Sequence, residues 1–248
     1  MLVPMRAILD AADKNGYAQG AFNVNAVCQV KAAVDVHQIL RSPAIIQGAD
    51  LANGFMGGRT DFANSTLEDK KAGAKNIGAA VKKYAADSDI PVALHLDHGK
   101  NFDSCIAAIE GGYTSVMIDG SSLPFDENVE LTREVVKYAH ARGVSVEGEL
   151  GVLAGVEDHV FSSTSTYTNP LKAVEFFKKT GCDALAISYG TMHGANKGKN
   201  AVIRKEIAIA IKECMLHEGI EGYLVSHGSS TVPQYIVEEI NALGGAIT

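Results

Sequence analysis

Short apolar runs alternate with longer stretches of helical periodicity along most of this chain. The apolar runs are rich in strand-forming residues and carry few internal polar positions, which is typical of strands buried on both faces of a parallel sheet. Their polar residues gather at the strand ends. We predict seven strands, over residues 21–24, 43–47, 91–97, 115–119, 145–151, 184–189 and 223–228.

The stretches between these runs have the spacing of amphipathic helices. Pro170 stands at a favourable first helical position, and Gly143 and Gly181 follow helical patterns where a left-handed cap is needed. We predict helices over 27–40, 68–86, 127–141, 170–179 and 203–218, and a strand start followed by a polar helix at the N-terminus. Alternating strands and helices predict an α/β fold, a TIM (β/α)8 barrel.

Two segments and the C-terminus depart from a regular barrel. Residues 48–67 and 152–169 are rich in Gly, Ser and Thr and exceed ordinary βα loops, which indicates functional or mobile loops. After a helical pattern near 232–242 the sequence stops at Thr248 without an eighth strand. We therefore expect the eighth βα unit to be absent from this sequence and the native chain to continue. The length predicts one catalytic domain, 1–248.

Composition excludes several classes of partner. The net charge of −7, with 21% charged residues, indicates neither a nucleic-acid footprint nor a basic membrane-binding face. No apolar run has membrane-spanning length. The four cysteines form no CxxC pair, and the N-terminus does not have the pattern of a signal peptide. We expect a cytoplasmic protein.

Three histidines follow three predicted strands. His98, His193 and His227 come just after the third, sixth and seventh strands. In a β/α barrel the loops after the strands converge on one face, so these side chains are expected at the same rim. A lone strand-end histidine is more often structural than a ligand, but three on one face favour a metal. Neutral imidazoles suit zinc, with an open position for a substrate oxygen.

Carboxylates occupy the same predicted rim. Asp97, beside His98, is either a general acid/base or a carboxylate that orients an imidazole. Asp119 and Glu149 end the fourth and fifth strands and either form a second metal position or support the first. The sequence alone does not separate these roles.

Two loops have the composition of a phosphate cradle. Residues 190–198, which include Gly194 and Lys197, and residues 227–230 surround two of the histidines with glycine, serine and lysine. Backbone N–H groups could approach an anion there. The first loop is not a Walker A loop, because its spacing is short and no Ser or Thr follows the lysine.

The other histidines have a structural interpretation. His37, His140 and His217 fall in helical patterns and are expected at helix surfaces or ends. His95 lies within a strand and is expected to be a hydrogen-bonded barrel residue. His159, in the loop after the fifth strand, stays open between the two interpretations.

Seven ordered segments together resemble a known family. GAFNVN, HLDHG, SVMIDGS, VEGELG, YTNP, GTMHGANKG and LVSHGSS are similar to segments of class II fructose-bisphosphate aldolases, from the N-terminus to about residue 245. The resemblance implies a zinc ion held by His98, His193 and His227, with Asp97 as acid/base. It further implies an alternative or second metal site at Asp119 and Glu149, a substrate contact at Asn25, proton exchange by Glu157, and a phosphate cradle at Gly194, Gly228, Ser229 and Ser230.

The family also implies the reaction, which is reversible cleavage of fructose 1,6-bisphosphate to dihydroxyacetone phosphate and glyceraldehyde 3-phosphate through a zinc-stabilised enediolate, within glycolysis and gluconeogenesis. It implies a homodimer or homotetramer. Ala49 and Ala154 stand where many members carry a substrate-contacting serine and a loop glycine. A tagatose-bisphosphate aldolase and a non-catalytic metal-binding barrel remnant are the alternatives. A zinc amidohydrolase is disfavoured, because FNVN replaces the HxH pair that it requires.

Overall fold

The computed structural model describes residues 1–153, 155–157, 160–162, 166–194, 202–229, 232–236 and 238. At 155–157 and 160–162 the description covers the backbone alone. The chain divides into two compact units. Unit 1 is Met1–Ile118 with Glu134–Val146, and unit 2 is Asp119–Arg133 with Glu147–Thr248. The assignment of a single domain over 1–248 stays a prediction.

All seven predicted strands form in the described part of the chain, within one sheet. They are β1 (Ala21–Asn23), β2 (Ala44–Ala49), β3 (Val92–Gly99), β4 (Ser115–Ile118), β5 (Ser145–Leu150), β8 (Ala184–Ile187) and β9 (Tyr223–Val225), in that order across the sheet. Strands β1 to β4 pair in parallel, and so do β5, β8 and β9. The order and the intervening helices are those of a TIM-type β/α barrel, which confirms the predicted fold class.

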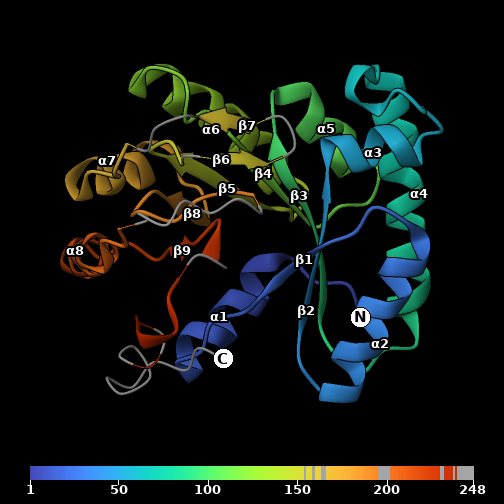
Figure 1. Cartoon of the computed structure of the whole chain (residues 1–248), viewed down its shortest axis with the longest axis horizontal. Coiled ribbons are helices and arrows are strands. Elements are labelled where there is room, and N and C mark those ends of the chain that lie inside the picture. Colours follow the sequence, from blue (N-terminus) through green and yellow to red (C-terminus); the bar gives the residue numbers. More distant parts are fainter. Residues whose placement is uncertain are drawn as a thin grey trace. The chain divides into compact units, whose positions relative to one another are not determined.

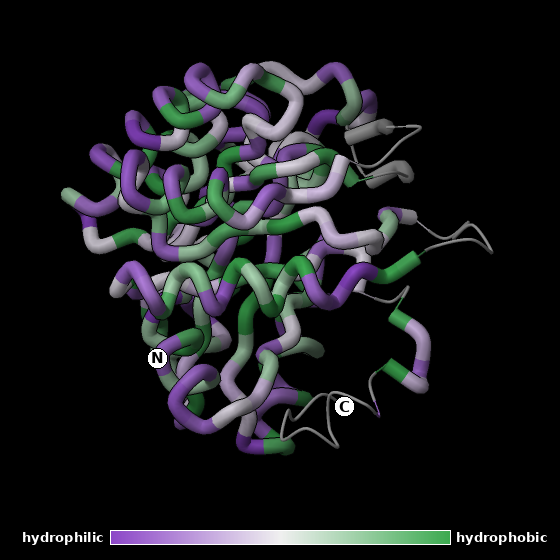
Figure 2. The backbone as a smooth tube through the Cα atoms, turned by 90° about the vertical axis from the view of Figure 1, so that its left-hand side faces the viewer, coloured by the Kyte–Doolittle hydropathy of each residue, from purple (hydrophilic) through white to green (hydrophobic). Residues whose placement is uncertain are grey.

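Unit 1 covers its strands with helices; those over 27–40 and 67–86 match the predicted ones, whereas the helix over 102–110 was not predicted. It contains α1 (Met5–Asn15), α2 (Val27–Leu40), α3 (Asp50–Met56), α4 (Leu67–Ala86) and α5 (Phe102–Glu110). Helices α2 and α4 lie side by side (Figure 1). Hydrophobic and hydrophilic residues alternate along the helices, as Figure 2 shows, because each helix buries one stripe. All eight residues of β3 are buried.

The prediction of a long loop over 48–67 is wrong in part. The segment contains α3 and a 3-10 turn, Phe62–Asn64. Helix α3 includes a glycine and is too short to be stable alone. It is stabilised by tertiary contact with α4 instead. A Cβ atom on Gly73 of α4 would lie 1.7 Å from the Asn53 carbonyl oxygen, so the missing side chain lets the two backbones approach.

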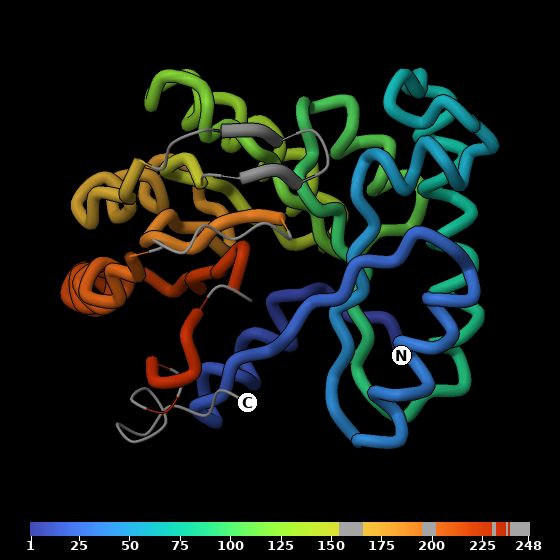
Figure 3. The backbone as a smooth tube through the Cα atoms, in the orientation of Figure 1, coloured from blue at the N-terminus to red at the C-terminus, as the bar shows by residue number. Residues whose placement is uncertain are grey.

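Unit 2 contains α7 (Pro170–Thr180) and α8 (Lys205–His217), which pack against each other (Figure 3). The Asn169 side chain accepts from the backbone N–H of Leu171 and Lys172, and Gly181 ends α7 with a φ of 70°, as predicted. Helix α6 (Phe125–His140) contributes residues to both units.

The segment 152–169 carries an antiparallel hairpin, β6 (Gly155–Glu157) with β7 (Val160–Ser162). Its base is fixed by backbone hydrogen bonds. The Thr166 N–H donates to the Val152 carbonyl at 2.9 Å, and the Thr168 N–H donates to the Ser188 carbonyl at 2.9 Å. A functional role for this segment stays a prediction.

The helical pattern near 232–242 falls largely outside the described residues. Over the described ranges, no helix combines the length and the apolar character that crossing a membrane would require.

Candidate active site

Asp97 and His98 lie at the carboxyl end of β3, where 2% and 4% of their surfaces are exposed. The pairing of β3 with β4 shifts register between Leu96 and Gly99, and His98 has a φ of 47°. A non-glycine residue with positive φ is strained, and a bulge of this kind turns a side chain away from the regular alternation. The backbone strain at His98 is therefore consistent with a functional position.

Asn23 is a site residue that the sequence analysis missed. Its side-chain amide, on β1, donates from Nδ2 to Asp97 Oδ2 at 2.8 Å. The backbone N–H of Asn25, the residue chosen from the resemblance, donates to Gln29 Oε1 at 2.6 Å, and its substrate contact stays a prediction. Both asparagines belong to the motif FNVN, but only the register of β1 through β2 to β3 indicates that Asn23 lies near Asp97.

In unit 2, the two carboxylates at the ends of β4 and β5 differ in their surroundings. Asp119 Oδ1 accepts from the Ser121 N–H at 3.1 Å and from the Ser121 hydroxyl at 2.6 Å, which holds the turn after β4. Glu149 is 1% exposed, and its backbone carbonyl accepts from Asn128 Nδ2 at 2.8 Å. Each side chain offers an oxygen that could ligate a metal.

His193 and His227 come together in unit 2, and their role as metal ligands stays a prediction. Their ring centroids are 5.8 Å apart with an interplanar angle of 61°. A glycine makes this approach feasible, because a Cβ atom on Gly228 would lie 2.4 Å from the Met192 carbonyl oxygen. Gly228 also has a φ of 63°, which favours glycine. The loops after β8 and β9 therefore pack closely, and they bring the two imidazoles to one place.

A second residue missed from the sequence is Glu147 on β5. Its Oε1 atom lies 2.9 Å from His227 Nε2, and Glu147 is 2% exposed. The only sequence feature that could have found it is the alternation in VEGELG, which places Glu147 and Glu149 on the same face of the strand.

The predicted phosphate cradle is described only in part. Gly194 and Ser229 are exposed, and Gly228 is partly buried. Lys197 and Ser230 lie outside the described residues, and so does the side chain of Glu157. The roles given to these six residues stay predictions.

The remaining histidines divide between the core and the surface. His37 lies in the last turn of α2, at a helix end as expected, but its side chain is buried, which was not predicted. Its Nδ1 lies 2.7 Å from the Ala33 carbonyl, and its ring packs edge-on against Phe22. His95 is buried, and its Nδ1 bonds Ser115 Oγ at 2.8 Å, which confirms the structural interpretation. His140 and His217 are exposed, as expected, and His159 lies outside the described residues.

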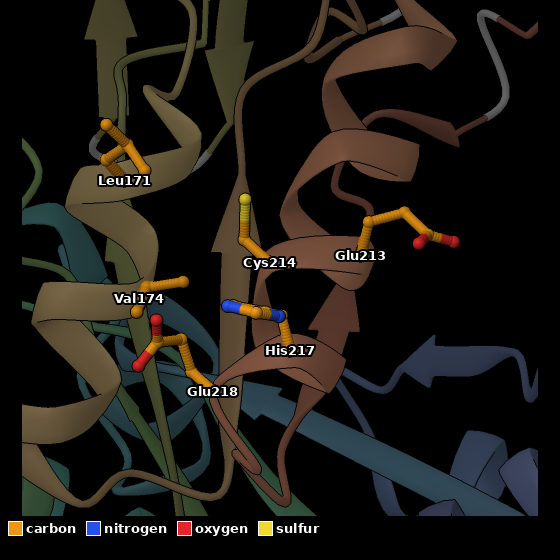
Figure 4. Close-up of a pocket in the computed structure, with 6 residues that line it drawn as sticks. All are labelled: Leu171, Val174, Glu213, Cys214, His217 and Glu218. Atoms are coloured by element: carbon orange, nitrogen blue, oxygen red, sulfur yellow. The ribbon is translucent and has the colours of Figure 1, made fainter.

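A groove between α7 and α8 is separate from these strand-end residues. Figure 4 shows the side chains that line it: Leu171, Val174, Glu213, Cys214, His217 and Glu218. Glu218 forms an ion pair with Lys178, and Leu171 is 73% exposed. The groove contains none of the predicted site residues.

Comparison with known proteins decides the family. The model of the class-II fructose-bisphosphate aldolase family matches residues 3–246. The chain belongs to this family. The fructose-bisphosphate aldolase of Treponema pallidum is 42% identical to it over 98% of this chain and 74% of that protein. The fructose-bisphosphate aldolase of Giardia intestinalis is also 42% identical, over 98% of this chain and 70% of that protein.

Solved structures agree with this family assignment. The YdjI aldolase of Escherichia coli K12 superposes with a TM-score of 0.76 at 28% identity, over 99% of this chain and 80% of that one. The fructose-bisphosphate aldolase of Campylobacter jejuni shares the fold, with a TM-score of 0.78 at 23% identity over 99% of this chain and 75% of that one. The chain is thus a class-II aldolase, a carbon–carbon lyase of a metal-dependent family.

Proposed function

We propose that this chain catalyses the reversible aldol cleavage of fructose 1,6-bisphosphate, with zinc as its metal. One observation carries the proposal: the imidazole ring centroids of His193 and His227 lie 5.8 Å apart. The chain belongs to the class-II family, whose members depend on a metal. The products are dihydroxyacetone phosphate and glyceraldehyde 3-phosphate.

The donor atoms present fit a divalent cation. Imidazole nitrogens are ligands that zinc accepts readily, and three protein ligands leave a coordination position for a substrate oxygen. In our proposal His98, His193 and His227 are the zinc ligands, and Asp119 and Glu149 provide a second divalent site. When bound, the cation supplies positive charge that polarises the ketone carbonyl and stabilises the negative charge that develops there.

Asp97 is the general base of the cleavage step in this proposal. It accepts the proton of the hydroxyl group at carbon 4, and the electron pair of that O–H bond forms the aldehyde C=O. The bond between carbons 3 and 4 breaks, and its electrons move to the three-carbon ketone fragment. Asn23 holds Oδ2 of Asp97 at 2.8 Å, so the carboxylate is oriented before substrate arrives.

Glu157 and the glycine-rich loops complete the proposed cycle. Glu157 delivers a proton to carbon 3 of the ketone fragment, which gives dihydroxyacetone phosphate. Gly194, Lys197, Gly228, Ser229 and Ser230 hold the phosphate of that product. The hairpin base, fixed at Val152 and Thr166, positions the segment that carries Glu157.

The proposed metal dependence is tested by removing metal with a chelator and restoring it. Cleavage activity should disappear with the metal and return with added zinc. Borohydride should trap no substrate on a lysine, because the mechanism forms no Schiff base. Full activity in metal-free protein, or a borohydride adduct, would exclude the proposal. Absence of both metal binding and turnover would favour the non-catalytic remnant.

The substrate is tested by comparing the cleavage rates of fructose and tagatose 1,6-bisphosphate, which differ in configuration at one carbon. We expect the higher kcat/KM for the fructose epimer. The reverse preference would identify a tagatose-bisphosphate aldolase.

The proposal extends to assembly and location, for which the family resemblance is the support. A homodimer or homotetramer is expected, and light scattering on the purified chain measures its mass directly. A cytoplasmic location is expected as well, and fractionation of the source cell tests it.

A further inference from the structure

Glu147 and His227 form a buried acid–imidazole pair within unit 2. The Glu147 carboxylate is 2% exposed, and the distance from its Oε1 to His227 Nε2 is 2.9 Å. Glu147 lies on β5, and His227 lies in the loop after β9. Glu147 pairs with Ala184 on β8, and Ala184 pairs with Tyr223 on β9. The contact therefore crosses from β5 over β8 to the residue that follows β9.

A hydrogen bond of this kind selects which nitrogen of the ring carries a proton. A carboxylate accepts but does not donate, so Nε2 of His227 must be the N–H nitrogen. In the neutral ring the other nitrogen, Nδ1, then has the lone pair that a metal requires. The carboxylate also fixes the ring orientation and raises the basicity of the ligating nitrogen.

We propose that Glu147 is a positioning residue that holds His227 in the Nε2–H tautomer, so that the ring ligates the metal through Nδ1. This inference rests on the proposed function, because His227 is a metal ligand only there. Glu147 itself touches neither the metal nor the substrate.

The burial of the Glu147 carboxylate has a free-energy cost that some interaction must offset. An ionised carboxylate that leaves water costs several kcal/mol unless it is paired and hydrogen-bonded. A hydrophobic side chain at position 147 would fill the same strand interior without that cost. The competing explanation is a structural ion pair between Glu147 and a protonated His227, and it makes a different prediction about metal affinity.

The first experiment measures zinc affinity by competition with a chromogenic chelator, in the full chain. Glu147→Ala should weaken zinc binding by roughly 10- to 100-fold, the range for loss of such a supporting partner. Glu147→Gln should weaken it less, because the amide oxygen still accepts from Nε2 but has no charge. Glu213→Gln, an exposed residue on α8, is the matched control and should bind zinc like the parent.

A double-mutant cycle separates action through His227 from a general effect of negative charge. In a His227→Ala background, Glu147→Gln should have no further effect on zinc affinity beyond about twofold. An equal loss in both backgrounds would overturn the proposal. So would a Glu147→Gln protein that melts at a lower temperature yet binds zinc with unchanged affinity, since that is the result of a structural ion pair.

The tautomer itself is read by long-range nitrogen–proton NMR of histidine-labelled protein. The His227 signals, identified by their loss in His227→Ala, should show N–H at Nε2 and a metal-bound Nδ1 after zinc is added. Zinc bound at Nε2 would contradict the inference. A parent chain that binds no zinc would instead contradict the proposed function, so the two failures are distinguishable.

Discussion

At the scale of single residues, the most consequential contact in unit 1 is the hydrogen bond from Asn23 to Asp97. A general base must be held in one rotamer to act on a bound hydroxyl group, and a buried carboxylate needs a donor to stay charged. Asn23 provides this donor from a neighbouring part of the sheet, at 2.8 Å.

We expect Asn23→Ala to lower kcat by about 10- to 100-fold, because a hydrogen bond to a charged group contributes roughly 1.5–3 kcal/mol. Zinc affinity should change by less than about twofold. Steady-state kinetics and a chelator competition measure the two quantities. Asn15→Ala, on the exposed side of α1, is the control: it removes an asparagine side chain far from Asp97 in the sequence and should keep the kcat of the parent. An unchanged kcat in Asn23→Ala would show that Asp97 needs no such support.

Cys182 provides a pH-dependent prediction at the same scale. Burial raises the pKa of its thiol to about 12, whereas an unfolded cysteine ionises near about 8.5. At a pH above the pKa of the unfolded thiol, the unfolded chain has lost a proton that the folded chain keeps. The free energy of unfolding is therefore unaffected by this thiol below about pH 8 and falls as pH rises from about 9 toward 12.

Ionisation of this one thiol should lower the free energy of unfolding by about 1 kcal/mol per pH unit in this range. Urea unfolding at pH 8, 9 and 10 measures it, and Cys182→Ala should lose stability less steeply with pH than the parent. Cys105, which burial shifts in the same direction, is present in both proteins and does not affect the difference. If the free energy of unfolding fell with pH equally steeply in Cys182→Ala and the parent, the Cys182 thiol would not be the cause of the fall.

Residue identities were only partly predictable. The sequence indicated Asp97 and the histidines because they end apolar runs, and chain order alone locates a strand end. It did not distinguish Asn23 from Asn25, or single out Glu147, since these depend on which side chains face each other across β-strands. Register is a property of the paired sheet rather than of any one segment.

At the scale of elements, the contact between α3 and α4 shows how tertiary packing overrides local propensity. Gly73 weakens α4 in isolation, since glycine is about 1 kcal/mol less favourable than alanine inside a helix. Its missing side chain is what permits the close approach of α3. The start of α4 is favourable by contrast, because Thr66 and Asp69 form a capping box.

Gly73→Ala should therefore destabilise the protein by about 2 kcal/mol or more, although alanine is the better helix former. The added Cβ would lie 1.7 Å from the Asn53 carbonyl oxygen, and the backbones must move apart to accept it. Chemical unfolding measures the change. Lys75→Ala, at an exposed position of the same helix, should stay within about 0.5 kcal/mol of the parent. A stabilised Gly73→Ala would mean that α3 does not pack there.

At the scale of the whole molecule, the proposed zinc ligands come from segments far apart in the sequence: His98 from β3, and His193 and His227 from the loops after β8 and β9. A metal that binds only the folded chain stabilises it by mass action. At a free zinc concentration of about 100 times Kd this amounts to roughly 2.7 kcal/mol, which should raise Tm by about 5 to 10 °C for a chain of this size.

Thermal melts with zinc and with excess chelator measure that shift. His98→Ala should melt at nearly the same temperature in both conditions. His140→Ala, an exposed residue of α6, should keep the full shift of the parent. A zinc-dependent shift that survives in His98→Ala would remove this histidine from the ligand set.

The sequence by itself determined the alternation of strands and helices, the parallel sheet and the family. These follow from local periodicity and from ordered motifs, which need no knowledge of long-range contacts. The tertiary structure alone decided that α3 forms, that His37 is buried, and that Asn23 and Glu147 support site residues. Each of those outcomes depends on atoms that folding brings together from distant parts of the chain. The number of residues between two atoms does not determine the distance between them in the folded protein.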